Sequence, residues 1–125
     1  MSATTAQRRA LVVENDDSIR RLVAKVLSRE GFEIDQASNP DDAIARLQSD
    51  AGYSLVILDL MLQPRGGADV VAFLKDHFPP TLRRLVIVTT APQAVRHGLP
   101  DDVCSVVSKP FDLEALIEAI HECAE

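Results

Sequence analysis

Apolar residues gather in short runs along the chain, and polar residues follow each run directly. Unbroken runs of four apolar residues occupy positions 10–13, 55–58 and 85–88, and a looser run occupies 103–107. Runs of this length with polar residues on either side are typical of strands that are buried on both faces of a parallel sheet. Residues 32–37 alternate between apolar and polar types instead, which predicts a half-exposed strand at the edge of the sheet.

Between these predicted strands, apolar residues recur at helical spacing. The clearest stripe consists of Ile19, Leu22, Val23, Val26 and Leu27, which share one face of a helix. Asp16 or Asp17 can cap the start of this helix, and Gly31 suits the position just past its end. The first predicted helix therefore connects the first predicted strand to the second.

Further helices are expected after the other predicted strands. Pro40 suits the first turn of a helix that continues to about residue 47, and Pro79 ends another that runs over 70–78. A short, weak helix is expected over 92–97, and Asp112 can cap a last helix that carries apolar residues from 113 to 120. Five strands thus alternate with five helices.

This alternation predicts an α/β protein with a doubly wound parallel sheet and helices on both faces. Because the second strand has an edge pattern and the first, third and fourth have buried patterns, the flavodoxin-like order 2-1-3-4-5 is favoured. No linker or repeat divides the chain, so residues 8–125 are expected to form one domain. Residues 1–7 have no apolar periodicity and are expected to be a disordered tail.

Composition narrows the class of partner. The formal net charge of −6 at pH 7 argues against nucleic acid or an anionic membrane as a direct partner. No apolar run is long enough to cross a membrane and no secretory signal opens the chain, so a cytoplasmic location is expected. Cys104 and Cys123 have neither metal-ligand nor redox-motif spacing, and we expect them to be small core or surface residues rather than a disulfide.

Chemically active side chains follow four of the five predicted strands. Because parallel strands end at one edge of the sheet, these side chains should meet there: Glu14, Asn15 and Asp16 after the first strand, Asp59 after the third, Thr89 after the fourth and Lys109 after the fifth. Carboxylates can hold a hard cation such as Mg²⁺, and a carboxylate nucleophile beside a cation, an ammonium and a hydroxyl suits phosphoryl transfer. Taken singly, each residue has a simpler explanation as a cap, a strand filler or a solvated charge.

These motifs, in this order, resemble the receiver domain of two-component response regulators. The resemblance covers about residues 9–124. It is carried by the segments 11–16, 58–61, 88–90 and 108–111, with Lys-Pro-Phe at 109–111 the most specific, and by the loop glycine Gly67. The family is a set of signalling modules that catalyse only their own phosphorylation and dephosphorylation, so no enzyme acting on an outside substrate is expected.

The resemblance implies a role for each matching residue. Asp59 would accept phosphate from a phosphohistidine on a sensor histidine kinase or a histidine phosphotransfer protein. Thr89 and Lys109 would bind the phosphoryl group and switch the domain, and the Lys109–Pro110 bond would be cis.

The resemblance also implies a magnesium site, although one ligand is unusual. Glu14, Asn15, Asp59 and the backbone carbonyl of Met61 would hold Mg²⁺. The family normally has an aspartate where this chain has Asn15. An amide oxygen can bind a hard cation but adds no charge, so we expect weakened Mg²⁺ binding. Asp16 is an alternative ligand if the loop turns it inward; equally, it can serve only as a helix cap.

Two functions remain open from the sequence. One is a stand-alone receiver that signals through protein contacts on the face formed by the fourth helix, the fifth strand and the fifth helix. The other is a degenerate receiver that serves as a phosphorylation-independent binding scaffold, and Asn15 in place of the usual aspartate is the residue that indicates it. A receiver that is one part of a hybrid histidine kinase is a further alternative.

Overall fold

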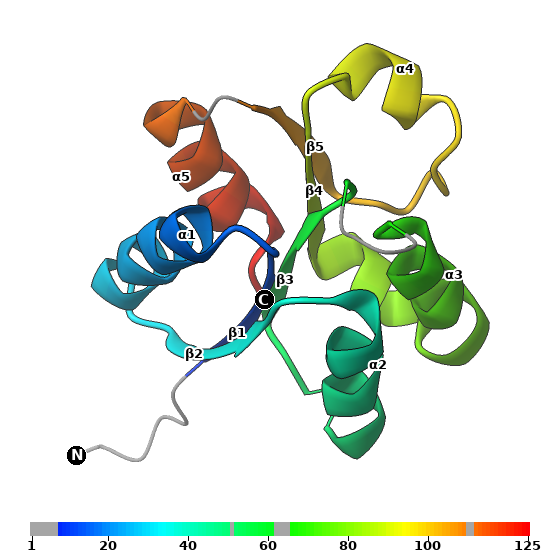
Figure 1. Ribbon diagram of the computed structural model, residues 1–125, viewed down its shortest axis with the longest axis horizontal. Helices are drawn as coiled ribbons and strands as arrows, with labels where there is room; N and C mark the ends of the chain where they lie inside the picture. Colours follow the sequence, from blue (N-terminus) through cyan, green and yellow to red (C-terminus); the bar gives the residue numbers. More distant parts are fainter. Residues whose placement is uncertain (1–7, 51, 62–65, 110–111) are drawn as a thin grey trace.

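Five parallel strands form a single sheet in the order β2-β1-β3-β4-β5, which confirms the predicted topology and the edge position of β2 (Figure 1). The computed structural model describes residues 8–50, 52–61, 66–109 and 112–125. The strands are β1 (Arg9–Val13), β2 (Glu33–Ala37), β3 (Leu55–Asp59), β4 (Leu85–Thr89) and β5 (Ser105–Ser108). The expected tail at residues 1–7 lies outside the described residues.

Helices cover both faces of the sheet, as predicted. Helix α1 (Asp17–Arg29) and α5 (Leu113–Cys123) lie on one face, and α2 (Pro40–Ser49) and α3 (Ala68–His77) lie on the other, with the short α4 (Pro92–Arg96) beyond them (Figure 1). None of these helices has the length and apolar character that crossing a membrane requires, within the part of the chain that the structure describes.

The two faces of the sheet pack into two separate apolar cores, because side chains alternate along each strand. Leu11 and Val13 of β1 face the core under α2 and α3, together with Val56 and Leu58 of β3. Their neighbours in the strands, such as Val12 and Ile57, face the core under α1 and α5. Burial on both sides explains why β3 and β4 read as unbroken apolar runs in the sequence.

Three helices begin with a side-chain cap. Asp16 caps α1 by accepting a hydrogen bond from the Ile19 N–H, and Asn39 and Asp112 cap α2 and α5 in the same way. Pro40 lies in the first turn of α2, as predicted. The cap on α1 holds the loop that follows β1 at the edge of the sheet where the polar residues gather.

Several element boundaries differ from the sequence-based expectations. Strand β5 covers 105–108 rather than 103–107, since the Cys104 N–H donates to the carbonyls of Leu82 and Leu85 before the regular pairing with β4 begins. Helix α3 ends at His77, and a 3₁₀ helix that was not predicted, η1 (Pro79–Arg84), connects it to β4. The two prolines that end α3 lie in the first turn of η1.

The prediction for the cysteines was wrong, because Cys104 and Cys123 form a disulfide with a Cα–Cα distance of 5.9 Å. The two residues are 19 positions apart, and their sequence spacing matches no redox motif. Helix α5 packs against the sheet and returns its last turn to the level at which β5 begins, so tertiary packing brings the sulfur atoms together.

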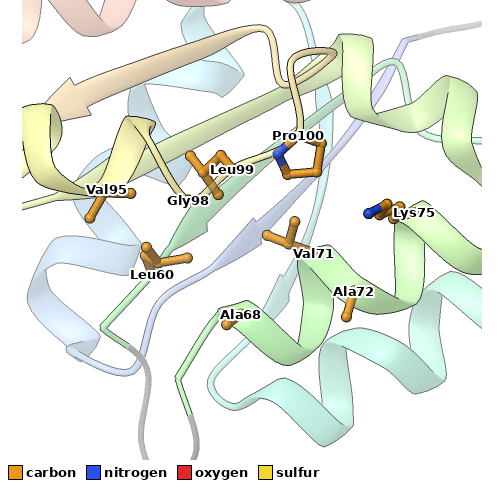
Figure 2. Close-up of a pocket in the computed structure, with 9 residues that line it drawn as sticks. All are labelled: Leu60, Ala68, Val71, Ala72, Lys75, Val95, Gly98, Leu99 and Pro100. Atoms are coloured by element: carbon orange, nitrogen blue, oxygen red, sulfur yellow. The ribbon is translucent and has the colours of Figure 1, made fainter.

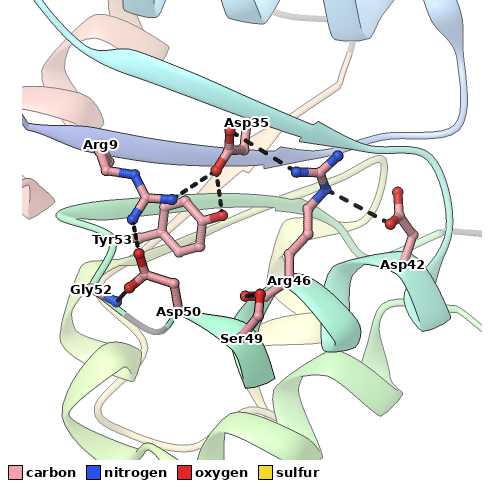
Figure 3. A network of polar contacts seen from close by, with 8 residues as sticks. All are labelled: Arg9, Asp35, Asp42, Arg46, Ser49, Asp50, Gly52 and Tyr53. Atoms are coloured by element: carbon pink, nitrogen blue, oxygen red, sulfur yellow. Dashed lines mark hydrogen bonds and ion pairs between the residues drawn. The ribbon is translucent and has the colours of Figure 1, made fainter.

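A polar network fastens the edge strand β2 to the rest of the sheet (Figure 3). Asp35 of β2 accepts hydrogen bonds from Arg9 of β1 at 2.8 Å and from the Tyr53 hydroxyl at 2.6 Å. The Arg9 guanidinium also contacts Asp50 and lies over the Tyr53 ring. These contacts lie at the amino-terminal end of the strands, far from the edge that carries Asp59.

Candidate functional site

The carboxyl ends of four strands bring the candidate residues to one edge of the sheet. Glu14 follows β1, Asp59 is the last residue of β3, Thr89 is the last residue of β4 and Lys109 follows β5. The strand register aligns Val13 with Leu58, Asp59 with Val88 and Thr89 with Ser108, so these ends lie at the same level. The apolar runs therefore serve to carry these polar side chains to one place.

The ammonium group of Lys109 connects the two buried carboxylates. Its Nζ donates to Glu14 Oε1 at 2.7 Å and to Asp59 Oδ2 at 3.2 Å. The side chains of Glu14 and Asp59 are each 4% exposed and that of Lys109 is 15% exposed. Two carboxylates with one ammonium leave one negative charge uncompensated in a buried setting, where the attraction for a further cation is strong.

The pKa values of Glu14 and Lys109 depend on this burial. Burial raises the pKa of the Glu14 carboxyl, and the hydrogen bond from Lys109 opposes the rise without cancelling it. Burial also acts to lower the pKa of Lys109, but its hydrogen bonds to Glu14 and Asp59 prevail, so the pKa lies above the ordinary lysine value. Lys109 is therefore a fixed positive charge at neutral pH.

Both carboxylate oxygens of Asp59 have a donor. Oδ1 accepts a hydrogen bond from the backbone N–H of Met61 at 2.9 Å, and Oδ2 accepts from Lys109. The Leu60 N–H continues the pairing with the β4 carbonyl of Val88 at 3.0 Å, which fixes the backbone directly after the carboxylate. The carboxylate is thus held in one orientation, which favours reaction with a group that approaches the sheet edge.

Gly67 lies against the backbone of Asp59 and Leu60, at a position that requires a glycine. A Cβ atom on Gly67 would lie 2.7 Å from the Asp59 carbonyl and 2.9 Å from Leu60 Cα, distances that side chains do not tolerate. The Gly67 N–H also donates to the Leu60 carbonyl at 2.8 Å. The reason for the loop glycine is therefore this close backbone approach.

The three residues after β1 have different positions. Glu14 points into the site, where its Oε2 accepts from the Asp16 N–H at 3.1 Å, whereas Asn15 is exposed. Asp16 is exposed and its Oδ1 accepts from the Ile19 N–H at 3.0 Å. Of the two roles open to Asp16, the structure gives it the helix cap.

Arg20 contributes to the site, and sequence reasoning missed it. Its guanidinium donates to the Glu14 carbonyl at 2.9 Å and also contacts Asp17 and Gln36. This arginine therefore braces the loop that carries Glu14. In the sequence it is one of several charged residues on the polar side of α1, and no pattern sets it apart.

The oxygen-rich donor set fits a hard divalent cation. Glu14 and Asp59 supply buried carboxylates with one uncompensated charge, and oxygen ligands are those that Mg²⁺ prefers. Among the described residues, no group of three or more His, Cys, Asp or Glu side chains is arranged to hold a metal ion. A metal at this site would thus rely on Asn15 or on backbone oxygens to complete its ligands.

Thr89, at the end of β4, is completely buried. Its Oγ1 accepts a hydrogen bond from the Ala91 N–H at 3.2 Å, and its backbone carbonyl accepts from the Lys109 N–H at 2.8 Å. The hydroxyl oxygen thus contacts the backbone at the start of α4. Pro110, with its predicted cis bond, and Phe111 lie outside the described residues.

A cavity of about 370 Å³ lies beside the site, between α3 and the segment that follows α4 (Figure 2). Its wall includes Leu60, directly after Asp59, and Val71, Val95 and Leu99, with Lys75 at its rim. Val95 and Leu99 are only partly buried against the core. Helix α4 and the turn after it therefore have room to shift relative to α3.

Comparison with known proteins gives a consistent result. The model of the response regulator receiver domain family matches residues 10–121. The receiver domain of NtrX from Brucella abortus is 32% identical, with a TM-score of 0.70 over 90% of this chain and 98% of that one. Vibrio cholerae CheY4 is 24% identical, with a TM-score of 0.77 over 94% and 99% of the two chains, which bears on the fold alone.

A longer curated relative is also similar. The transcriptional regulatory protein SrrA of Staphylococcus aureus is 42% identical over 67 residues, which are 54% of this chain and 27% of that protein. The matched region thus spans about a quarter of the length of that relative.

Proposed function

The chain belongs to the response regulator receiver domain family, and on this premise we propose that Asp59 accepts a phosphoryl group from a phosphohistidine. Receiver domains interact with histidine kinases, so the proposed donor is a sensor histidine kinase or a histidine phosphotransfer protein. The observation that carries the proposal is the buried contact of Lys109 Nζ with Asp59 Oδ2 at 3.2 Å. A nucleophilic carboxylate with a fixed positive charge beside it suits phosphoryl transfer.

In the proposed reaction, a carboxylate oxygen of Asp59 attacks the phosphorus atom of the phosphohistidine. The phosphorus–nitrogen bond breaks, its electron pair stays on the imidazole of the donor, and an acyl phosphate forms on Asp59. Lys109 remains protonated and offsets charge on the phosphoryl oxygens, since its contacts with Glu14 and Asp59 raise its pKa. The Met61 N–H donates a hydrogen bond to Asp59 Oδ1 and keeps the carboxylate oriented.

Mg²⁺, which receiver domains generally bind, supplies charge neutralisation for the transferring phosphoryl group when bound. We propose Glu14 and Asp59 as its carboxylate ligands, with the Asn15 amide oxygen and the Met61 carbonyl. Because Asn15 adds no charge, Mg²⁺ affinity is expected to be lower than with an aspartate there.

The proposed output is a shift of the β4–α4 segment. A phosphoryl group on Asp59 gives the Thr89 hydroxyl a new, charged partner and takes it from the Ala91 N–H at 3.2 Å. The start of α4 then loses a hydrogen bond, next to a cavity that leaves it room to move. The altered α4–β5–α5 face would be read by a protein partner, as a population shift between two states. Direct contact with nucleic acid or a membrane does not suit the net charge of −6.

The test is phosphorylation with a small phosphodonor such as acetyl phosphate in the presence of Mg²⁺, followed by intact-mass measurement. The protein is expected to gain one phosphoryl group, and Asp59→Asn, which keeps the size of the side chain, is expected to gain none. Asp76→Asn, which changes an exposed acid on α3, serves as the matched control and should behave as the wild type. Uptake that persists in Asp59→Asn would contradict the proposed acceptor.

The second candidate function is a degenerate receiver that binds partners without phosphorylation. It is favoured by the exposure of Asn15 and by the capping role of Asp16, which leave two buried carboxylates for a cation. Absence of any phosphoryl uptake at saturating Mg²⁺, with the fold intact, would select this function. In either case we propose that residues 8–125 act as one receiver domain, a cytoplasmic signalling module rather than an enzyme for an outside substrate. A stand-alone protein and one part of a hybrid kinase are both compatible with this proposal.

A further inference from the structure

The Cys104–Cys123 disulfide joins the residue that leads into β5 to the last residue of α5. The Cys104 N–H donates to the carbonyls of Leu82 at 3.2 Å and Leu85 at 3.1 Å, so its backbone is anchored to the end of η1 and the start of β4. The bond therefore ties the free end of α5 to the framework of the sheet. It lies far from Asp59, at the opposite ends of the strands.

The two cysteines differ in their access to solvent. Cys123 is 2% exposed and belongs to the core under α1 and α5. Cys104 is half-buried and lines an open groove of about 590 Å³ between α4 and β5, together with Arg96, His97, Ser105 and Val106. Cys104 is thus the more accessible of the two residues, although it also packs against the core that contains Cys123.

The groove has groups that favour an anionic thiol. Arg96 NH1 donates to the Val103 carbonyl at 3.1 Å, which holds its guanidinium one residue away from Cys104. His97 lines the same groove. The exposed Asp101 and Asp102, shortly before Cys104 in the chain, carry negative charge and oppose the attraction of an anionic thiol. A thiolate and the carboxylates of a glutathione-like thiol would be attracted by the guanidinium.

The expected compartment makes a permanent bond here unusual. This step rests on the proposed function: a phosphohistidine donor is made with ATP in a reducing compartment, where thiols are kept reduced. Disulfides found in such compartments are mostly transient or redox-sensing rather than structural. A disulfide in which Cys104 is half-buried is therefore expected to be reduced and re-formed reversibly.

We propose that Cys104 is a thiol-modification site and that the Cys104–Cys123 bond is reversibly reduced by a carboxylate-bearing small thiol that enters the α4–β5 groove. The thiolate attacks Cys104 Sγ, the bond to Cys123 breaks, and Cys123 Sγ leaves as a thiolate that takes a proton from water. A second thiol then attacks the mixed disulfide and releases Cys104. In sum, two small thiols become one disulfide and the protein disulfide becomes two thiols.

Reduction loosens the end of α5 without unfolding the domain. Glu125, two residues after α5, keeps the hydrogen bond from its N–H to the Ser54 carbonyl at 3.0 Å and the ion pair with Arg84 at 3.6 Å. The covalent constraint is lost, however, and the thermal midpoint is expected to fall by about 10 °C. Helix α5 and strand β5 are two of the three elements of the proposed output face, so the redox state would change how firmly that face is held.

A pair of single variants tests which cysteine is addressed. Folded Cys123→Ser is treated with glutathione disulfide and is expected to gain one glutathionyl group on Cys104, detected by intact mass and peptide mapping. Folded Cys104→Ser is expected to react at least ~10-fold more slowly, because Cys123 is buried. Equal rates, or faster reaction of Cys123, would overturn the assignment of Cys104.

A redox titration tests reversibility in the wild type. The protein is equilibrated in buffers of graded glutathione to glutathione disulfide ratio, and the fraction with free thiols is measured after alkylation, with circular dichroism to confirm the fold. The proposal expects a reversible midpoint inside the range that glutathione sets, with faster amide exchange over residues 113–123 after reduction. A bond that stays oxidised at the most reducing ratio would overturn it.

Two further measurements separate the parts of the proposal. Arg96→Gln is expected to slow reduction by glutathione roughly threefold while leaving reduction by the neutral thiol 2-mercaptoethanol unchanged; equal effects on both thiols would overturn the role of the guanidinium. Asp59→Asn is expected to give the same redox titration as the wild type. A failed redox titration and a failed phosphorylation would therefore be recognised separately.

Discussion

Lys109 Nζ lies closer to Glu14 than to Asp59, at 2.7 Å from Glu14 Oε1 and 3.2 Å from Asp59 Oδ2. The ammonium is thus bound most tightly to the residue that the proposed reaction does not modify. Since all three side chains are largely buried, Lys109 can turn toward a phosphoryl group on Asp59 while it keeps its contact with Glu14. This arrangement connects the proposed nucleophile to the stability of the domain.

Replacement of this lysine tests the connection. Lys109→Met keeps much of the apolar stem but leaves Glu14 and Asp59 without a buried counter-charge, so we expect a loss of about 3 kcal/mol in the free energy of unfolding. Phosphoryl uptake should also fall, because the charge beside the acceptor is gone. Urea denaturation and the intact-mass assay measure the two effects.

The control for this variant is Lys25→Met, which changes an exposed lysine of α1. It should alter the free energy of unfolding by no more than about 0.5 kcal/mol. If Lys109→Met were as stable as this control, the three buried charges would not be coupled in the way that their distances indicate.

Asn15 sets the charge of the proposed metal site. Asn15→Asp is expected to tighten Mg²⁺ binding roughly tenfold, because it adds a carboxylate where the amide has no charge. Isothermal titration calorimetry with Mg²⁺ measures the difference. An unchanged affinity would mean that the side chain at position 15 does not bind the ion.

Asp16 supplies the matched comparison. Asp16→Ser removes the carboxylate but retains an oxygen that can cap α1, so both Mg²⁺ affinity and helix stability should stay near the wild-type values. A clear drop in Mg²⁺ affinity would instead make Asp16 a ligand.

The hydroxyl of Thr89 is expected to couple phosphorylation to α4. Thr89→Val keeps the shape of a completely buried side chain but removes the acceptor for the Ala91 N–H, at a cost of about 1 kcal/mol. Asp59 should still be phosphorylated, while the change in amide exchange over residues 90–100 should shrink. Thr90→Val, at the exposed neighbouring position, should leave that change intact.

The Tyr53–Asp35 hydrogen bond predicts a pH dependence of stability (Figure 3). The hydrogen bond from Tyr53, and then that from Arg9, keep the pKa of Asp35 below its usual value, although burial opposes this. A lowered carboxyl pKa stabilises the fold above the unfolded-state pKa, and that stability is lost as the pH falls through the folded-state pKa. The pKa of Tyr53 is raised to about 12, chiefly by burial and secondly by the hydrogen bond to Asp35. Its contribution is complete below about pH 10 and is lost as the pH rises toward 12.

Tyr53→Phe tests both ends of this profile. The variant should lose about 1 kcal/mol at neutral pH, a modest amount because Asp35 remains a third exposed. The difference from the wild type should diminish both in acid, below the carboxyl pKa, and above pH 10. Urea denaturation across this range measures it, and a difference that does not vary with pH would contradict the role of the hydrogen bond.

The sequence alone determined the sheet and the membership of the site. Burial on both faces of a parallel sheet demands unbroken apolar runs, so β1, β3 and β4 could be recognised, and alternation marked β2 as the edge strand. Because all parallel strands end at one edge, the positions of Glu14, Asp59, Thr89 and Lys109 after the strands were enough to predict that these residues meet. Local rules also predicted a cap at Asp16 or Asp17 for α1, a cap at Asp112 for α5 and Pro40 in the first turn of α2.

Tertiary structure decided how these residues are used and which distant ones join. Asp16 was compatible with both a metal ligand and a cap, and only the path of the loop turned its carboxylate to the Ile19 N–H. Arg20 braces Glu14 from α1, whose exposed residues Arg21 and Lys25 are also basic, so the sequence does not set it apart. The Cys104–Cys123 bond depends on where α5 packs, a long-range contact that no spacing encodes. Periodicity reports burial and direction along an element, whereas pairings between elements arise only when the chain packs in three dimensions.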